Sequence, residues 1–192
     1  MPTRKTSLAC FVFLILAIGG GCKSSGSGSG TGEAVAKASA PSRPRIDRSV
    51  PELAPAINNP LPEARLVDIN GGTLPEESLR RGKVVLMFLN PTCAPCNTEA
   101  EFLRTVIDKR RDISFYGVAT LGAKEESLKM AAELFPFKTF YDEDGLLTKN
   151  LGITRMPIKI FVENGVVKES WGGASKSPEV QADFVKWMEE VK

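Results

Sequence analysis

The sequence predicts an α/β fold in which a central mixed β-sheet is flanked by helices. Apolar runs at 83–90, 113–119 and 158–162 have the length of strands and are dense enough for strands covered on both faces. The segments between and after these runs carry apolar residues three and four positions apart, which is the spacing of amphipathic helices. A hairpin turn at 163–165 and a closing helix complete an alternation that is typical of layered sheets.

Composition and charge narrow the class of function. The chain has 192 residues, 42% of them hydrophobic, which suffices for one globular domain and an additional segment. The formal net charge is only +2 and basic residues are interspersed with acidic ones, so we expect no nucleic-acid partner. The sequence contains no histidine. This disfavours histidine-based hydrolytic triads, Cys/His zinc sites and most haem sites, and we expect no metal and no cofactor.

Residues 1–21 are predicted to form a signal peptide of the lipoprotein type. A basic start precedes an apolar run at 8–18, which is too short to cross a bilayer core about 30 Å thick. The glycines before Cys22 resemble a bacterial lipoprotein signal, in which that cysteine is lipidated, although Gly19 replaces the usual leucine. We therefore expect export to the periplasmic side of a bacterial membrane, with a lipid anchor at Cys22. Simple cleavage near the glycines, giving a soluble exported protein, is the alternative.

Residues 22–60 are predicted to be a flexible tether, and 61–192 the folded domain. The tether is rich in Gly, Ser and Pro and has too few apolar side chains to offset the entropy lost on ordering. A flexible chain of this length spans roughly 35 Å on average, so it would hold the domain clear of a membrane surface.

A pair of cysteines follows the first long strand. The run at 83–90 ends in the loop Pro-Thr-Cys-Ala-Pro-Cys at 91–96, and a helical pattern comes next. Cys93 is therefore expected at a helix amino terminus, where unpaired N–H groups and the helix dipole favour a negatively charged sulfur. We predict that Cys93 is the attacking thiol and that Cys96, about one turn further on, releases the substrate by closing a disulfide. Pro95 suits the first helical turn, where its missing N–H costs nothing.

The stretch from Cys93 to Glu99 resembles the active site of the thioredoxin superfamily. The pattern Cys-x-Pro-Cys-x-x-Glu is similar in particular to the membrane-tethered TlpA-like and ResA-like branch. The resemblance covers roughly residues 66–192. It implies a thioredoxin-like fold with an N-terminal β-hairpin near 65–74 and an inserted central helix at 124–135.

The resemblance also implies roles for residues around the cysteines. Pro157 occupies the place of the family's cis proline, which presents the backbone of the preceding residue, here Met156, to a bound peptide. Glu99 lies one helical turn after Cys96, and a glutamate at this place tunes the thiols in the ResA-like pattern. We hypothesise that Glu99 accepts or relays the proton of Cys96. A solvent-exposed helix glutamate is the alternative.

The active-site loop departs from the family pattern in two places. Thr92 replaces the tryptophan that commonly precedes the first cysteine, and Ile158 replaces the threonine that commonly follows the cis proline. We expect Thr92 to cap the helix. Ala94 and Pro95, between the cysteines, and Met156 shift the reduction potential. Related couples span about −270 to −120 mV, so the direction of electron flow stays open.

The sequence therefore predicts a thiol-disulfide oxidoreductase whose Cys93/Cys96 dithiol reduces disulfides of exported proteins. The family resemblance adds a role in cytochrome c maturation or copper-oxidase assembly. In an oxidising compartment a dithiol needs an electron donor. Protein disulfide substrates and a membrane thiol-transfer donor are accordingly the expected partners.

Three alternatives concern the same cysteine pair. A Cu(I) carrier would use Cys93, Cys96 and Met156 as soft ligands, but the chain lacks the histidine found in copper-assembly relatives of this fold. Peroxiredoxins resemble this fold but carry Pro and Thr where Leu86 and Asn90 stand here, which disfavours a thiol peroxidase. A purely structural disulfide would close so short a loop that it would stabilise the fold little.

Overall fold

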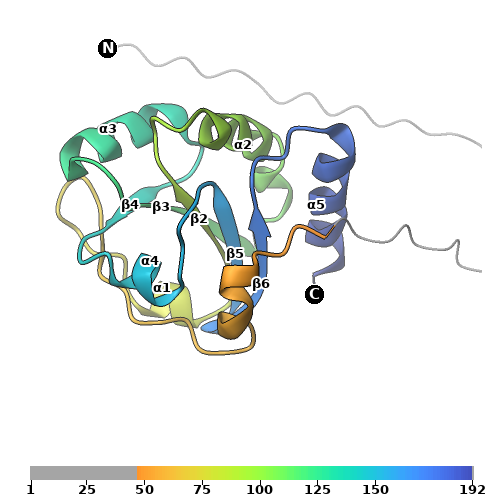
Figure 1. Ribbon diagram of the computed structural model, residues 1–192, viewed down its shortest axis with the longest axis horizontal. Helices are drawn as coiled ribbons and strands as arrows, with labels where there is room; N and C mark the ends of the chain where they lie inside the picture. Colours follow the sequence, from red (N-terminus) through yellow and green to blue (C-terminus); the bar gives the residue numbers. More distant parts are fainter. Residues whose placement is uncertain (1–46, 192) are drawn as a thin grey trace, which may run out of the picture. The chain divides into compact units, whose positions relative to one another are not determined.

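The computed structural model describes residues 47–191 of the chain. The predicted signal peptide, Cys22 and the tether up to residue 46 lie outside the described residues and stay predictions. Within the described part, a mixed six-stranded sheet is flanked by helices, which confirms the predicted α/β class (Figure 1). Every helix among residues 47–191 is too short or too polar to cross a membrane.

The sheet is parallel at its centre and antiparallel towards its edges. Its strands are β1 (Leu66–Val67), β2 (Lys83–Leu89), β3 (Ile113–Ala119), β4 (Thr139–Asp142), β5 (Ile158–Glu163) and β6 (Val166–Gly172). They lie in the order β1-β4-β3-β2-β5-β6. β3 pairs in parallel with β2 and with β4, whereas β1, β5 and β6 run antiparallel to their neighbours. The predicted runs at 83–90, 113–119 and 158–162 are thus the adjacent strands β2, β3 and β5, nearly to the residue.

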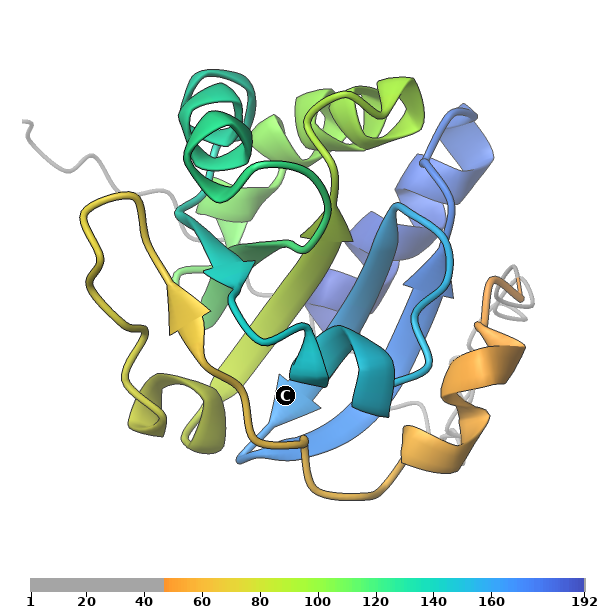
Figure 2. The ribbon, with the colours of Figure 1, turned by 60° about the vertical axis from the view of Figure 1, so that its left-hand side comes forward.

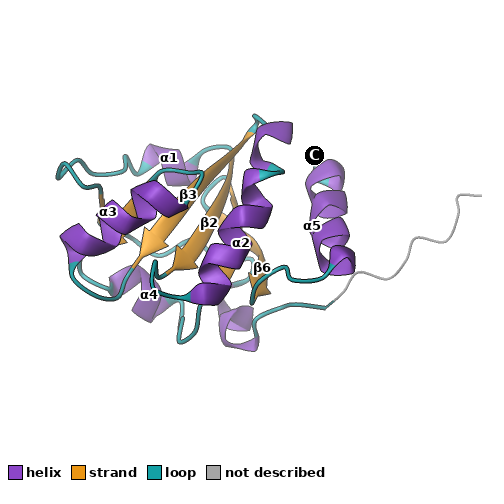
Figure 3. Ribbon diagram, turned by 90° about the horizontal axis from the view of Figure 1, so that it is seen from above, coloured by secondary structure: helices purple, strands orange, loops and turns teal. Residues whose placement is uncertain are grey.

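Helices cover both faces of this sheet. They are η1 (Pro51–Ala56), α1 (Glu77–Arg80), α2 (Ala94–Arg104), η2 (Ile107–Lys109), α3 (Lys124–Leu134), α4 (Leu146–Asn150) and α5 (Pro178–Glu190). Figure 1 places α2 and α3 above the sheet and α1 and α4 below it, and Figure 3 shows α2 and α3 lying across the same face. The predicted inserted helix is α3. The predicted N-terminal hairpin is present as a bridge between Val67 and Thr73.

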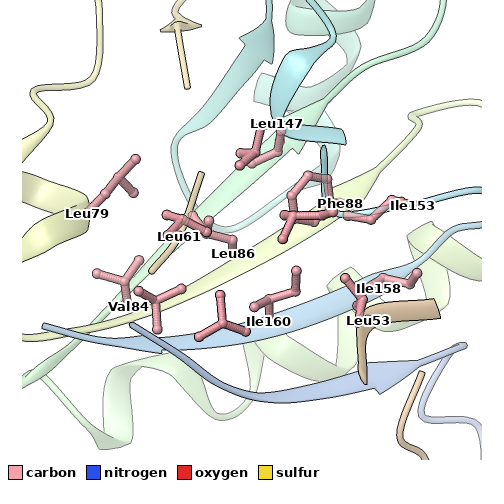
Figure 4. Packing of buried hydrophobic residues seen from close by; sticks show 14 of the residues in the cluster. Leu53, Leu61, Leu79, Val84, Leu86, Phe88, Leu147, Ile153, Ile158 and Ile160 are labelled. Carbon is pink, nitrogen blue, oxygen red and sulfur yellow. The ribbon is translucent and has the colours of Figure 1, made fainter. Parts of the chain in front are cut away.

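Two apolar cores form because side chains alternate along each strand. The even-numbered residues of β2 from 84 to 88 belong to a core shared with η1, α1 and α4 (Figure 4). The odd-numbered residues from 85 to 89 belong to a second core shared with α2, α3 and α5. Cys96 lies in this second core, so the inner cysteine is part of the packed interior.

The folded domain begins earlier than the sequence predicted. The tether was expected to reach residue 60, but Val50 and Leu53 are buried in the first core. The N–H of Gly172 in β6 donates to the carbonyl of Arg48 at 2.9 Å, and the N–H of Asn58 donates to Val167 at 2.7 Å. This segment therefore covers the edge strand β6, which would otherwise offer unpaired backbone groups (Figure 2).

Candidate active site

The candidate site lies at the carboxyl end of β2, where the chain turns into α2. Cys93 is the N-cap residue of α2, and its sulfur accepts a hydrogen bond from the N–H of Cys96 at 3.3 Å. Pro95 occupies the first helical turn, as predicted. A disulfide joins Cys93 to Cys96, whose Cα atoms lie 5.2 Å apart, so the structure represents the oxidised form.

The two sulfurs differ in their access to solvent. Cys96 is 0% exposed, whereas Cys93 is half-buried. Thr92, Ala94 and Pro95 surround Cys93 on the surface and are all exposed. A sulfur atom from outside can therefore reach Cys93 but not Cys96. The dipole and free N–H groups of the α2 amino terminus favour a thiolate at Cys93.

The predicted role of Thr92 as the helix cap is wrong. Its N–H and its hydroxyl both donate to the side-chain oxygen of Asn90, at 3.0 and 2.8 Å. This local turn occupies the Thr92 side chain, and such turns are typical of asparagine. The N–H of Cys93 closes the turn by donating to the carbonyl of Asn90 at 3.0 Å. The N-cap residue of α2 is therefore Cys93.

The loop before β5 faces the outer sulfur. Met156 and Pro157 are joined by a cis peptide bond, which confirms the isomer expected from the family resemblance. The carbonyl oxygen of Met156 lies 4.0 Å from the sulfur of Cys93. Pairing of Phe88 in β2 with Ile158 in β5 places this loop beside the end of β2. The structure thus brings together Cys93, Cys96, Met156 and Pro157, while their roles stay predictions.

Glu99 lies one turn beyond Cys96 on α2 and is 0% exposed. Its Oε1 accepts hydrogen bonds from the ammonium of Lys159 and, at 3.1 Å, from the hydroxyl of Ser175. Its Oε2 accepts one from the backbone N–H of Ser175. The alternative of a solvent-exposed glutamate is therefore wrong. Proton transfer between Glu99 and Cys96 remains a hypothesis.

The hydrogen-bond partners of Glu99 were not predicted from the sequence. Lys159 is 1% exposed, although lysine is almost never fully buried without a partner. A signal was present, because this lysine interrupts the apolar run at 158–162 of a strand covered on both faces. Such a lysine requires a buried acceptor. Ser175, in the loop after β6, carried no comparable signal.

The charges in this cluster compensate one another. Burial lowers the pKa of Lys159, and the neighbouring carboxylate of Glu99 opposes that shift. Arg48 approaches from the segment before η1 and donates to the hydroxyl of Ser175 at 3.1 Å. Burial lowers the pKa of Arg48, whereas Glu99 and Asp183 raise it. Two cations and two carboxylates thus interact within one polar cluster.

A family model and solved structures resemble this chain. The model of the AhpC/TSA family matches residues 57–170. No curated protein sequence matches the chain significantly. The structure of DsbF of Mycobacterium tuberculosis, in mixed oxidised and reduced forms, is similar with 25% sequence identity and a TM-score of 0.55. The match covers 67% of this chain and 93% of DsbF.

Two further structures share the fold at lower identity. A secreted M. tuberculosis disulfide oxidoreductase homologous to Escherichia coli DsbE is 22% identical with a TM-score of 0.56, covering 66% of this chain and 95% of that one. The exposed lipoprotein thioredoxin Etrx1 of Streptococcus pneumoniae is 15% identical with a TM-score of 0.55, covering 66% and 98%. These likenesses confirm the predicted thioredoxin-like fold. The disulfide-bonded pair Cys93 and Cys96 thus occurs on a fold that thiol-disulfide oxidoreductases use.

Proposed function

The chain belongs to the AhpC/TSA family, and from this premise we propose that it reduces disulfide bonds of exported proteins through the dithiol form of Cys93 and Cys96. The observation that carries the proposal is the unequal placement of the two sulfurs at the start of α2. Cys93 is accessible and lies beside the carbonyl of Met156, whereas Cys96 is enclosed by the core. This geometry suits an outer nucleophile and an inner resolving thiol.

The reaction consists of two thiol-disulfide exchanges. In the first, the Cys93 thiolate attacks one sulfur of the substrate disulfide, and the other substrate sulfur leaves as a thiolate. In the second, the sulfur of Cys96 attacks that of Cys93 and breaks the bond to the substrate. Two electrons pass to the substrate, whose sulfurs become thiols after taking up two protons. The enzyme is left with the Cys93–Cys96 disulfide that the structure contains.

The surface around Cys93 supports a protein substrate. The Met156 carbonyl offers a backbone acceptor beside the sulfur, which suits strand-like pairing with an extended peptide. Leu121 is 55% exposed and lies in the loop after β3. Because β2 and β3 are parallel, their carboxyl ends meet at one edge of the sheet. Leu121 therefore lies at the same edge as Cys93 and provides an apolar contact for the substrate.

We place the enzyme on the periplasmic side of a bacterial membrane, anchored through a lipid on Cys22. The signal-like segment at 1–21 supports this location, as do similar proteins described as secreted and as an exposed lipoprotein. A membrane dithiol carrier would return electrons to the Cys93–Cys96 disulfide. Cytochrome c maturation or copper-oxidase assembly, suggested by the TlpA-like pattern of Cys93 to Glu99, would supply the substrates.

The proposal is tested by reduction of insulin with dithiothreitol as the electron source. The full chain is expected to accelerate precipitation of the reduced insulin B chain. Cys93→Ser should abolish the acceleration, because it removes the nucleophile. Cys96→Ser, the matched control, should accumulate a mixed disulfide between Cys93 and insulin that mass spectrometry detects. Acceleration that persists in Cys93→Ser would refute the proposed function.

A further inference from the structure

The two exchange steps described above assign no role to a buried ion pair, which Glu99 of α2 forms with Lys159 of β5. The Lys159 ammonium donates to Glu99 Oε1, and both side chains are essentially inaccessible to solvent. Buried charges persist only where a partner and hydrogen bonds compensate them. Lys159 and Glu99 therefore stay buried as charged groups only because each compensates the other.

Strand alternation places Lys159 on the face of the sheet that α2 covers. Its partner across the β2–β5 ladder is Met87, which belongs to the same core as Cys96. On α2, Glu99 follows Cys96 by three residues, and such residues have Cβ atoms about 5–6 Å apart on one side of a helix. The ion pair therefore lies on the same face of the sheet, and on the same side of α2, as the inner sulfur.

The carboxylate is held by fixed donors but keeps a free acceptor position. Oε1 accepts from Lys159 and from the Ser175 hydroxyl, and Oε2 accepts from the Ser175 N–H. Among the described residues these are the only hydrogen bonds to Glu99, so a lone pair of Oε2 is available for a proton. Arg48 also donates to the Ser175 hydroxyl, which further fixes the position of that hydroxyl.

Charged groups approach the pair from two further elements of the fold. Arg48 comes from the segment before η1, and Asp183 of α5 interacts with Arg48. The ring of Phe184, also on α5, lies 5.0 Å from the Lys159 nitrogen and closes the cluster on that side. Lys159 is the cation in direct contact with the carboxylate.

The resolving step needs a proton acceptor inside the protein. A thiol attacks as its thiolate, so Cys96 must lose its proton before it attacks the mixed disulfide. Cys96 is enclosed in the core, which keeps bulk water away from its sulfur. Glu99 is the ionisable group nearest to Cys96 on its own helix.

We propose that Lys159 is a positioning residue for the resolving step, because its ammonium holds the buried Glu99 carboxylate in place to accept the proton of Cys96. This inference rests on the proposed function. The proton moves from the Cys96 sulfur to Glu99, the Cys96 electron pair forms the bond to Cys93, and the substrate sulfur leaves with the electrons of the broken bond. Glu99 afterwards returns the proton to the departing thiolate or to water.

The two exchange steps can be timed separately with the aromatic disulfide DTNB. The full chain carries Cys10→Ser and Cys22→Ser, so that Cys93 and Cys96 are its only thiols. With reduced protein and excess DTNB, attack by Cys93 releases the first thionitrobenzoate. Attack by Cys96 releases the second, at a rate that does not depend on the DTNB concentration.

Glu99→Gln and Lys159→Met are each expected to slow the second release about 100-fold, the usual scale of general acid–base catalysis. The first release should change less than about threefold. The double variant should be no slower than Glu99→Gln alone, because Lys159 acts through Glu99. Lys168→Met, which removes a partly exposed lysine from β6, is the matched control and should leave both rates unchanged.

The pH profile separates this role from a structural one. Across neutral pH, the second release in Lys159→Met should rise more steeply than in the double variant, because only the single variant retains a carboxylate that can ionise. The double variant is also the control for misfolding: it removes both buried charges, so neither is left unpaired to destabilise the fold. An unchanged second release in Lys159→Met, or effects that multiply in the double variant, would overturn the inference. If instead wild-type protein forms no Cys93–Cys96 disulfide, the proposed function itself fails.

Discussion

Removing one partner of the Glu99–Lys159 pair should destabilise the domain more than removing both. In Glu99→Met the ammonium of Lys159, 1% exposed, loses its carboxylate, and breaking a buried pair on one side costs about 3–5 kcal/mol. In the variant with methionine at both positions no charge is left unpaired, and such replacements range from neutral to about 1–4 kcal/mol stabilising. Both variants leave the N–H of Ser175 without its acceptor, at about 1–3 kcal/mol, so this cost cancels in the comparison. The single variant should therefore be less stable than the double variant by at least about 3 kcal/mol.

Urea unfolding of the oxidised protein, extrapolated linearly to water, measures this difference. In thermal unfolding it corresponds to roughly 6–12 °C in Tm, at about 2–4 °C per kcal/mol for a domain of this size. Lys168→Met, which removes a lysine outside the cluster, is the control and should stay within about 0.5 kcal/mol of wild type. Equal stability of the single and double variants would refute the energetic reasoning, because it would mean that the unpaired ammonium costs nothing.

Three other outcomes are expected. Cys22→Ser should move the protein from the membrane fraction to the soluble periplasmic fraction; protein that stays on the membrane would contradict a lipid anchor at this residue. Leu121→Asp should raise KM for insulin several-fold while leaving the first reaction with DTNB unchanged, since the small reagent needs no apolar surface; equal effects on both would argue against a substrate contact. Hydrogen peroxide should oxidise Cys93 no faster than free cysteine, measured by loss of thiol, and a much faster reaction would favour a thiol peroxidase.

The sequence predicted the sheet well because β2 and the second half of β3 are buried on both faces. The runs at 83–90 and 113–119 are almost continuously apolar, and they correspond to β2 and β3 with at most one residue of difference. The start of the domain was harder to predict. Val50 and Leu53 are isolated apolar residues among prolines and charges, and their burial depends on β6, which lies more than a hundred residues later in the chain.

In the site, too, features set by neighbouring residues could be predicted from the sequence, whereas contacts between distant segments could not. Cys93, Cys96 and Pro95 could be placed because strand, loop and helix are contiguous in the sequence. The Thr92 cap was wrong because Asn90, only two residues away, offered a competing acceptor. The pairing of Glu99 with Lys159 joins positions 60 residues apart and depends on the antiparallel register of β5 against β2. A pattern of spacing along one helix carries no information about that register.

The redox midpoint of the Cys93–Cys96 couple, titrated against glutathione, tests the proposed reductase most directly. The proposal predicts one two-electron transition, with a tenfold change in the equilibrium per about 30 mV, and a midpoint more negative than about −200 mV. A midpoint near about −120 mV, where strong disulfide donors lie, would contradict a reductase. The absence of any transition between dithiol and disulfide would contradict the exchange reaction itself.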